Sequence, residues 1–256
     1  MCLLDIGYAP MQKVSEPWTP QKVVDAVGDT SITPAAGSTS ILPFFHILER
    51  LKTTKREGWR RFGISRGESI ADHMYRMSII SMFAPASLAS RLDLHKCMKM
   101  CLIHDMAELL VGDITPIDGV PKAEKSRRET EAMDFLTKGL LKSVPGGLMT
   151  GEDIRAVWQE YEDSKTLDSH YVHDIDKIEL LLQMVEYERA GKGKLDLGEF
   201  AYVATKVTLP EMKERADEII KEREQIWDGT QHIHGEKAQG VTKEHTEMSD
   251  EYYRRD

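Results

Sequence analysis

Apolar residues recur at helical spacing through most of the chain, and this periodicity constrains the fold more than any other feature. From Ile41 to about Ile226, no run shows the two-residue alternation of an amphipathic strand. Ser69, Pro121 and Pro210 suit the first turns of helices. We therefore predict an all-α helical bundle. The expected helices cover residues 42–52, 69–83, 93–110, 121–142, 151–163, 167–191 and 209–226.

The two ends of the chain differ from this helical part. Several prolines and a stretch of small residues over 33–40 predict a flexible leader, residues 1–40, with little structure. The polar and charged segment 228–256 is expected to be disordered. One helical domain, residues 41–227, lies between them.

Composition excludes several classes of function. The formal net charge is −9 and no long Lys/Arg run occurs, which disfavours a nucleic acid polymer as partner. No stretch of about 18 apolar residues could span a membrane, and the first residues lack the features of a secretory signal. Three cysteines form no disulfide framework. We expect a cytoplasmic protein, with the nucleus as an alternative.

Four positions on three of the predicted helices carry the chemistry. At about 100° per residue, His73 falls on the apolar side of its helix, and the pair His104-Asp105 lies on or beside the inward face of the next. Asp176 lies among apolar residues of a third helix. A single histidine on such a face is more often a hydrogen-bonded core residue, but four such positions together favour one common explanation.

That explanation is a bound metal ion. Buried carboxylates cost several kcal/mol when unpaired and repel one another, and a divalent cation removes both penalties. Two imidazoles and two carboxylates form a mixed nitrogen and oxygen site suited to Mn, Co, Fe, Zn or Ni, whereas an all-oxygen set favours Mg or Ca. The predicted cofactor is a divalent cation, with manganese, cobalt, magnesium, zinc and nickel as candidates.

The motifs around these positions resemble a known family. The order H…HD…D is the signature of the HD superfamily of metal-dependent phosphohydrolases. Residues 68–77 (ESIADHMYRM), 102–108 (LIHDMAE) and 111–116 (VGDITP) are similar to the HD domain-containing 5'-deoxynucleotidases, and so is the helix around Asp176-Lys177-Ile178-Glu179. The resemblance implies an all-α HD domain, a homodimer, and 2'-deoxynucleoside 5'-monophosphate substrates.

The resemblance also assigns roles to single residues. Glu108, Asp113 and the Ile114 carbonyl match positions linked to catalysis or to a second cation. Glu108 comes one turn after His104, so it can act as general acid or base; holding His104 in one tautomer is the alternative. Asp113 can orient water, bind a second ion or meet the sugar, or simply serve the turn marked by Gly112. The residues implied as ligands of the catalytic metal are His73, His104, Asp105 and Asp176.

The substrate contacts are expected near Trp59. Bacterial relatives have an Arg-Trp pair, whereas this chain has Gly58-Trp59 followed by Arg60 and Arg61. Trp59 offers a flat wall for a base or a deoxyribose, and either arginine could clamp the phosphate. Ordinary packing for the tryptophan and a solvated face for the arginines are the alternatives.

The sequence therefore predicts a 5'-deoxynucleotidase, with two alternatives. One is another HD phosphohydrolase that acts on cyclic nucleotides, triphosphates or alarmones; the short chain, without sensor or synthetase domains, argues against it. The other is a catalytically silent binding module stabilised by a metal. The complete ligand set, together with Glu108 and Asp113, argues against silence.

Overall fold

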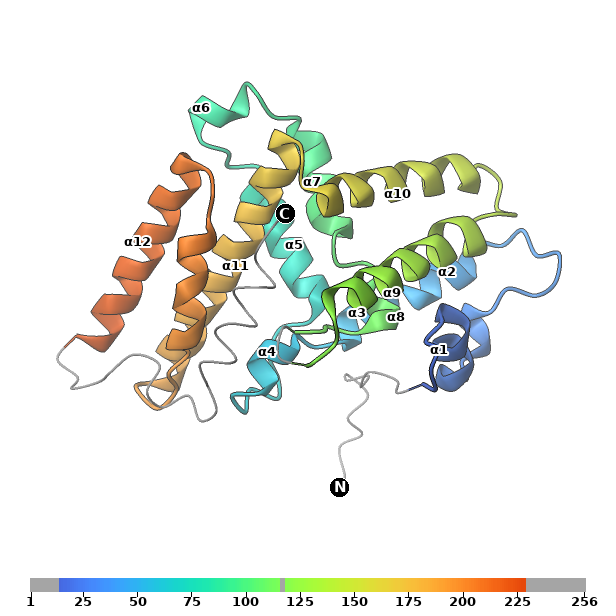
Figure 1. Cartoon of the computed structure of the whole chain (residues 1–256), viewed down its shortest axis with the longest axis horizontal. Helices are drawn as coiled ribbons and strands as arrows, with labels where there is room; N and C mark the ends of the chain where they lie inside the picture. Colours follow the sequence, from blue (N-terminus) through green and yellow to red (C-terminus); the bar gives the residue numbers. More distant parts are fainter. Residues whose placement is uncertain (1–13, 116–117, 229–256) are drawn as a thin grey trace. The chain divides into compact units, whose positions relative to one another are not determined.

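The regular elements of this protein are helices. The computed structural model describes residues 14–115 and 118–228, and no strand occurs within these ranges (Figure 1). Lys55 and Ser69 form an isolated antiparallel bridge. The prediction of an all-α fold is confirmed. In the described part of the chain, no helix combines the length and the apolar character needed to cross a bilayer.

The chain divides into two compact units, which are described separately. Unit 1 comprises residues 1–74 and 102–162, and unit 2 comprises 75–101 and 163–256. Helices α5 (Ile70–Ser81) and α7 (Leu94–Ile103) each contribute residues to both units. Unit 1 also contains α1 (Pro20–Val27), η1 (Thr30–Ile32), α2 (Leu42–Ile47), α3 (Glu49–Thr53), α4 (Glu57–Arg60), α8 (Glu108–Val111), α9 (Lys122–Asp134), η2 (Phe135–Leu140) and nearly all of α10 (Gly147–Asp163). Unit 2 also contains α6 (Ala86–Ala89), α11 (Leu167–Gly191), η3 (Gly198–Lys206) and α12 (Pro210–Trp227).

Residues 14–40 are not the structureless segment that the sequence analysis expects. They contain α1 and η1, and the Trp18 and Val23 side chains are buried. Arg127 of α9 donates a hydrogen bond to the Trp18 carbonyl at 3.3 Å. The expectation is wrong here because Pro20 occupies the first turn of a helix, where a missing backbone N–H costs nothing. The first part of the predicted leader (1–13) and nearly all of the predicted disordered tail (229–256) lie outside the described residues.

The helix predicted over 93–110 is also not continuous. Helix α7 ends at Ile103, and a turn over 104–107 separates it from α8. The Glu108 amide donates to the Asp105 carbonyl at 3.0 Å, and the Trp158 indole donates to the His104 carbonyl at 3.1 Å. The continuous helix would need a hydrogen bond from the Glu108 amide to the His104 carbonyl. A tertiary contact thus accompanies a change in local hydrogen bonding that helical periodicity cannot predict.

In unit 2, α11 and α12 pack side by side (Figure 1). Near the end of α12, Arg223 donates two hydrogen bonds of 2.8 Å to the fully buried carboxylate of Glu188. Where α12 begins, the buried Asp174 carboxylate accepts hydrogen bonds from the backbone amides of Thr208 and Leu209 at 3.0 and 2.7 Å. Buried charges are tolerated only when paired in this way, so these contacts tie both ends of α12 to α11.

Candidate active site

His73 is held by the first turn of α5. The Asp72 carboxylate accepts hydrogen bonds from the amide and hydroxyl of Ser69 at 2.8 and 2.7 Å, and the Ser69 hydroxyl accepts from the Asp72 amide at 3.1 Å. This reciprocal bonding satisfies amides that have no partner at a helix start and confirms Ser69 as a start signal. One residue later, His73 is fully buried, as are Met74 and Met77. The predicted inward face of this helix is confirmed.

His104 is held by contacts from α10. The Trp158 indole bonds its carbonyl, and the Tyr161 ring lies 4.9 Å from the imidazole centroid. The His104 side chain is buried, and its ring centroid lies 5.5 Å from that of His73. Sequence reasoning did not identify these α10 residues, because they lie more than fifty positions along the chain and form no motif with the histidine.

Asp105 joins the two histidines. Its Oδ2 atom lies 3.2 Å from Nε2 of His104 and 3.8 Å from Nε2 of His73. Two atoms bound to one ion at about 2.0–2.2 Å lie roughly 2.9–3.5 Å apart. The His104 separation falls within that range, and the His73 separation exceeds it by a few tenths of an ångström. Unit 1 alone therefore brings a carboxylate oxygen within 4 Å of two imidazole nitrogens, and these are donor types that suit a transition metal ion.

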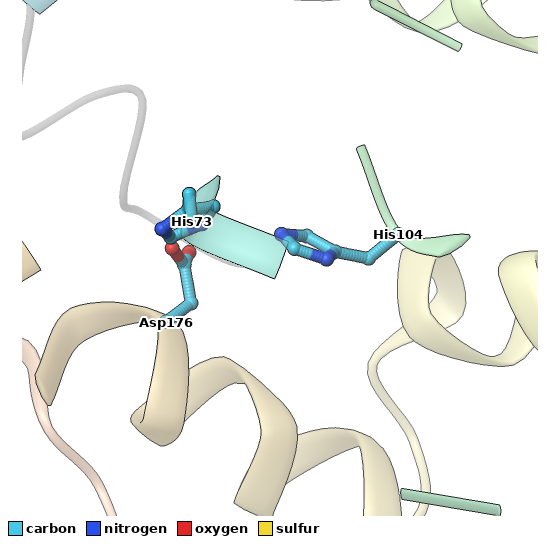
Figure 2. A group of neighbouring side chains, drawn as sticks. All are labelled: His73, His104 and Asp176. Atoms are coloured by element: carbon cyan, nitrogen blue, oxygen red, sulfur yellow. The ribbon is translucent and has the colours of Figure 1, made fainter. Parts of the chain in front are cut away.

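Figure 2 shows the imidazoles of His73 and His104 with the carboxylate of Asp176, the three side chains of a candidate metal-ligating group. Asp176 belongs to α11 in unit 2 and is half-buried. The chemistry of this set matches the mixed site that the sequence predicts.

Arg56 is a site residue that the sequence analysis missed. Its Nη1 atom lies 3.1 Å from Oδ2 of Asp105 and 3.8 Å from Oδ1 of Asp113. Burial alone would raise the pKa of Asp105, but the neighbouring His104, Arg56 and His73 hold that pKa well below its ordinary range. Asp105 is therefore an anion surrounded by positive or protonatable groups, as a metal ligand requires.

The two arginines that the sequence proposed as phosphate clamps have other contacts. Arg60 forms an ion pair of 2.7 Å with Glu57. The exposed Arg61 has its guanidinium 5.1 Å from the centre of the Phe62 ring. The Arg56 guanidinium, by contrast, lies beside Asp105, a predicted metal ligand. Only the tertiary arrangement distinguishes it, because its partner is 49 positions away.

Trp59 is a buried residue of α4, with 3% of its surface exposed. Its indole donates a hydrogen bond of 2.8 Å to the Glu68 carboxylate. This arrangement corresponds to the packing role that the sequence analysis kept as an alternative. A direct contact with the sugar stays a prediction.

Glu108 begins α8 and is 3% exposed. Its Oε2 atom is buried and has no hydrogen-bond partner among the described residues. Burial, followed by the charges of Asp105 and Asp113, raises the pKa of Glu108. A buried carboxyl oxygen without a partner is costly in a purely structural role, so this atom is available to a ligand.

Asp113 and Ile114 follow α8 in a turn. Gly112 has a φ of +83°, which confirms the predicted role of this glycine in the turn. The Asp113 Oδ2 atom accepts a hydrogen bond from the Glu57 amide at 2.6 Å. The Ile114 carbonyl accepts one from Nζ of Lys125 at 3.1 Å. Asp113 thus supports the start of α4, a contact with a distant residue that the sequence analysis did not expect. Its role toward water, a second ion or the sugar stays a prediction.

Comparison with known proteins places this geometry in a class. A family model described as HD domain matches residues 48–216. The chain belongs to the HD-domain family. Its relatives include 5'-deoxynucleotidase hdd1 of Schizosaccharomyces pombe, 44% identical over 75% of this chain and 95% of that protein. Human 5'-deoxynucleotidase HDDC2 is 36% identical over 73% of this chain and 88% of that protein.

Solved structures agree with this assignment. The HD domain-containing protein YGK1 superposes with a TM-score of 0.60 at 26% identity, covering 82% of this chain and 99% of that one. A conserved hypothetical protein from Pyrococcus furiosus has a TM-score of 0.53 at 25% identity over 71% of this chain and 98% of that one. The family that the sequence motifs suggest is therefore confirmed.

Proposed function

We propose that this protein is a metal-dependent 5'-deoxynucleotidase that hydrolyses 2'-deoxynucleoside 5'-monophosphates to deoxynucleoside and phosphate. The observation that carries the proposal is the cluster of the buried His73 and His104 with the half-buried Asp105, and with Arg56 beside it. Relatives that bear the name 5'-deoxynucleotidase and align over most of their length support the same activity. The homodimeric state and the cytoplasmic location stay predictions.

The residues that would hold the cation are His73, His104, Asp105 and Asp176. A divalent ion bound there supplies Lewis-acid activation of water and neutralises charge on the phosphoryl group. The nitrogen-containing donor set favours manganese, cobalt, zinc or nickel over magnesium for this position. The Trp158 indole restrains the backbone of His104 by its hydrogen bond to the His104 carbonyl. A metal ligand held in this way by a residue outside the site keeps its orientation.

The other groups act on the phosphate and on protons. The Arg56 guanidinium presents several donors in a fixed plane, which suits two oxygens of one phosphate. The Glu108 Oε2 atom, buried and without a partner among the described residues, can accept a proton from the attacking water or deliver one to the leaving 5' oxygen. The Arg56 guanidinium lies 3.1 Å from Oδ2 of Asp105. Burial and then the charge of Asp105 raise the pKa of Glu108.

The test is phosphate release from a panel of nucleotides by the metal-loaded protein. We expect kcat/KM to be roughly 5–150-fold higher for dAMP than for AMP, and for dCMP than for CMP. The physical reason is that burying a 2'-hydroxyl without a partner costs about 1–3 kcal/mol. The panel also contains cyclic nucleotides, triphosphates and alarmones, the substrates of the alternative HD hydrolases. Protein stripped of metal by a chelator is the negative control, and adding metal back should restore activity.

Equal rates on ribose and deoxyribose substrates would contradict the 5'-deoxynucleotidase proposal. Faster hydrolysis of a triphosphate or a cyclic nucleotide than of the deoxynucleoside monophosphates would indicate an HD hydrolase of a different substrate class. If the preference for deoxyribose over ribose substrates is unchanged in Trp59→Phe, the proposed function stands and residues other than Trp59 select the sugar.

A pair of arginine variants tests the phosphate clamp. Arg56→Gln should lower kcat/KM by roughly 10–150-fold, the loss expected from about 1.5–3 kcal/mol of a charge-assisted hydrogen bond. Arg61→Gln changes the residue that directly follows α4, and its kcat/KM should stay within a few fold of wild type. Metal content is measured in both variants, because Arg56 also contacts Asp105. A larger loss in Arg61→Gln would assign the clamp to Arg61, one of the two arginines that the sequence suggested.

A further inference from the structure

The side chains of His104 and Asp105 approach each other although the two residues are consecutive. Oδ2 of Asp105 lies 3.2 Å from Nε2 of His104. Successive side chains of a regular α-helix are about 100° apart and do not face each other. The approach of these two donors therefore goes with the turn over 104–107 and not with a continuous helix.

The turn over 104–107 has the hydrogen bonding of a tighter helix. The Met106 amide donates to the Ile103 carbonyl at 3.1 Å, and the Glu108 amide donates to the Asp105 carbonyl at 3.0 Å. Both bonds join residues three apart, the spacing of a 3₁₀ turn, which changes the angle between successive side chains. Glu108 follows this turn directly. The turn therefore sets how Asp105 lies relative to Glu108.

The Trp158 indole takes the carbonyl that a regular helix would use at this point. Trp158 is fully buried, and its Nε1 atom donates to the His104 carbonyl at 3.1 Å. In a continuous helix that carbonyl would accept the Glu108 amide instead. A buried indole N–H needs an acceptor, so the indole and the turn satisfy each other.

The indole is itself covered by Arg155 of α10. The Arg155 guanidinium lies 4.6 Å from the centre of the Trp158 ring, and a cation over an aromatic face is attracted to it. Arg155 also donates to Asp134 of α9 at 2.9 Å and to Gln159 at 2.7 Å. A chain of contacts within unit 1 thus runs from α9 through Arg155 and Trp158 to the backbone of His104.

We infer that Trp158, with Arg155 behind it, is a positioning residue of the metal site. Its hydrogen bond keeps the His104 carbonyl out of the helical pattern, and the resulting turn directs the His104 and Asp105 donors to one point. The inference rests on the metal site of the proposed function and extends it beyond the ligands. Contacts that orient metal ligands from outside contribute roughly 10–100-fold to metal affinity.

The test is the Co²⁺ affinity of a tryptophan variant. Protein stripped by a chelator is titrated with Co²⁺, whose visible absorption depends on the donors around it, so that binding at the histidines is distinguished from binding at oxygens alone. Trp158→Phe keeps an aromatic ring beneath Arg155 but removes the indole N–H. We expect its dissociation constant to rise by roughly 10–100-fold and the absorption of its bound Co²⁺ to change.

Trp227→Phe is the matched control. The Trp227 indole is also buried, and it donates to the Glu188 carboxylate in unit 2 at 2.9 Å. Each variant loses one buried hydrogen bond, so both stripped proteins should melt at a lower temperature than the wild type. Trp227→Phe should nevertheless bind Co²⁺ within a few fold of wild type and with an unchanged spectrum.

Wild-type affinity and spectrum in a folded Trp158→Phe would overturn this inference alone, and equal weakening in Trp227→Phe would overturn it as well. Absence of Co²⁺ binding in the wild type would instead contradict the metal site of the proposed function, so the two failures are distinguishable. If Trp158→Phe does not fold, Arg155→Met decides, because it keeps the indole and removes the guanidinium that covers it. Weaker Co²⁺ binding in Arg155→Met supports the inference, and unchanged binding overturns it.

Discussion

Replacing His104 or Asp105 by alanine is expected to abolish metal binding and nucleotidase activity together. Each change removes a donor from the cluster in which Asp105 Oδ2 lies 3.2 Å from one imidazole and 3.8 Å from the other. Activity should fall by at least about 10³-fold, since a bound cation contributes several kcal/mol of transition-state stabilisation. The measurements are metal content by mass spectrometry and phosphate release from dAMP.

The melting temperature provides a second readout of the same change. An ion that binds only the folded state stabilises it, so the wild type should melt at a lower temperature after chelation. His104→Ala and Asp105→Ala should show no such difference between metal-treated and chelator-treated samples. His95→Ala, an exposed histidine near the start of α7, is the matched control and should behave as wild type. Full metal content in both cluster variants would show that the metal site is elsewhere.

Glu108→Gln should keep the metal ion but lower turnover by roughly 10²–10⁴-fold, the usual contribution of a positioned acid or base. Glutamine has nearly the same shape, so the buried position at the start of α8 stays filled while proton transfer is lost. Metal content and kcat are measured on the same preparation. Glu152→Gln, an exposed residue of α10, controls for the loss of one negative charge.

Two results would contradict this role of Glu108. Turnover within a few fold of wild type would make it a bystander whose carboxyl group serves the local structure. Loss of the metal in Glu108→Gln would make it a ligand, and the proton transfer would then belong to another group. The unsatisfied Oε2 atom is the observation that favours proton transfer.

Local patterns in the sequence were sufficient for the fold class and for part of the site. Helical periodicity predicts the inward face of α5, because a repeat of about 3.6 residues follows from backbone geometry alone. It therefore placed His73 with Met77 in the core, as observed. Ser69 marked a helix start through its hydroxyl, a contact made within four residues. The motif order around His104-Asp105 then identified the family.

The contacts between distant residues depended on packing. Arg56 meets Asp105 across 49 positions, and Lys125 meets the Ile114 carbonyl across a turn. Neither pairing has a periodic or motif signal, so the adjacent Arg60 and Arg61 looked equally suitable as phosphate clamps. The tertiary structure decides such cases because a long cationic side chain has many rotamers, and only surrounding carboxylates and carbonyls select the one that is populated. The end of α7 before His104 likewise depends on packing, because a tryptophan from α10, 54 positions away, bonds the histidine's carbonyl.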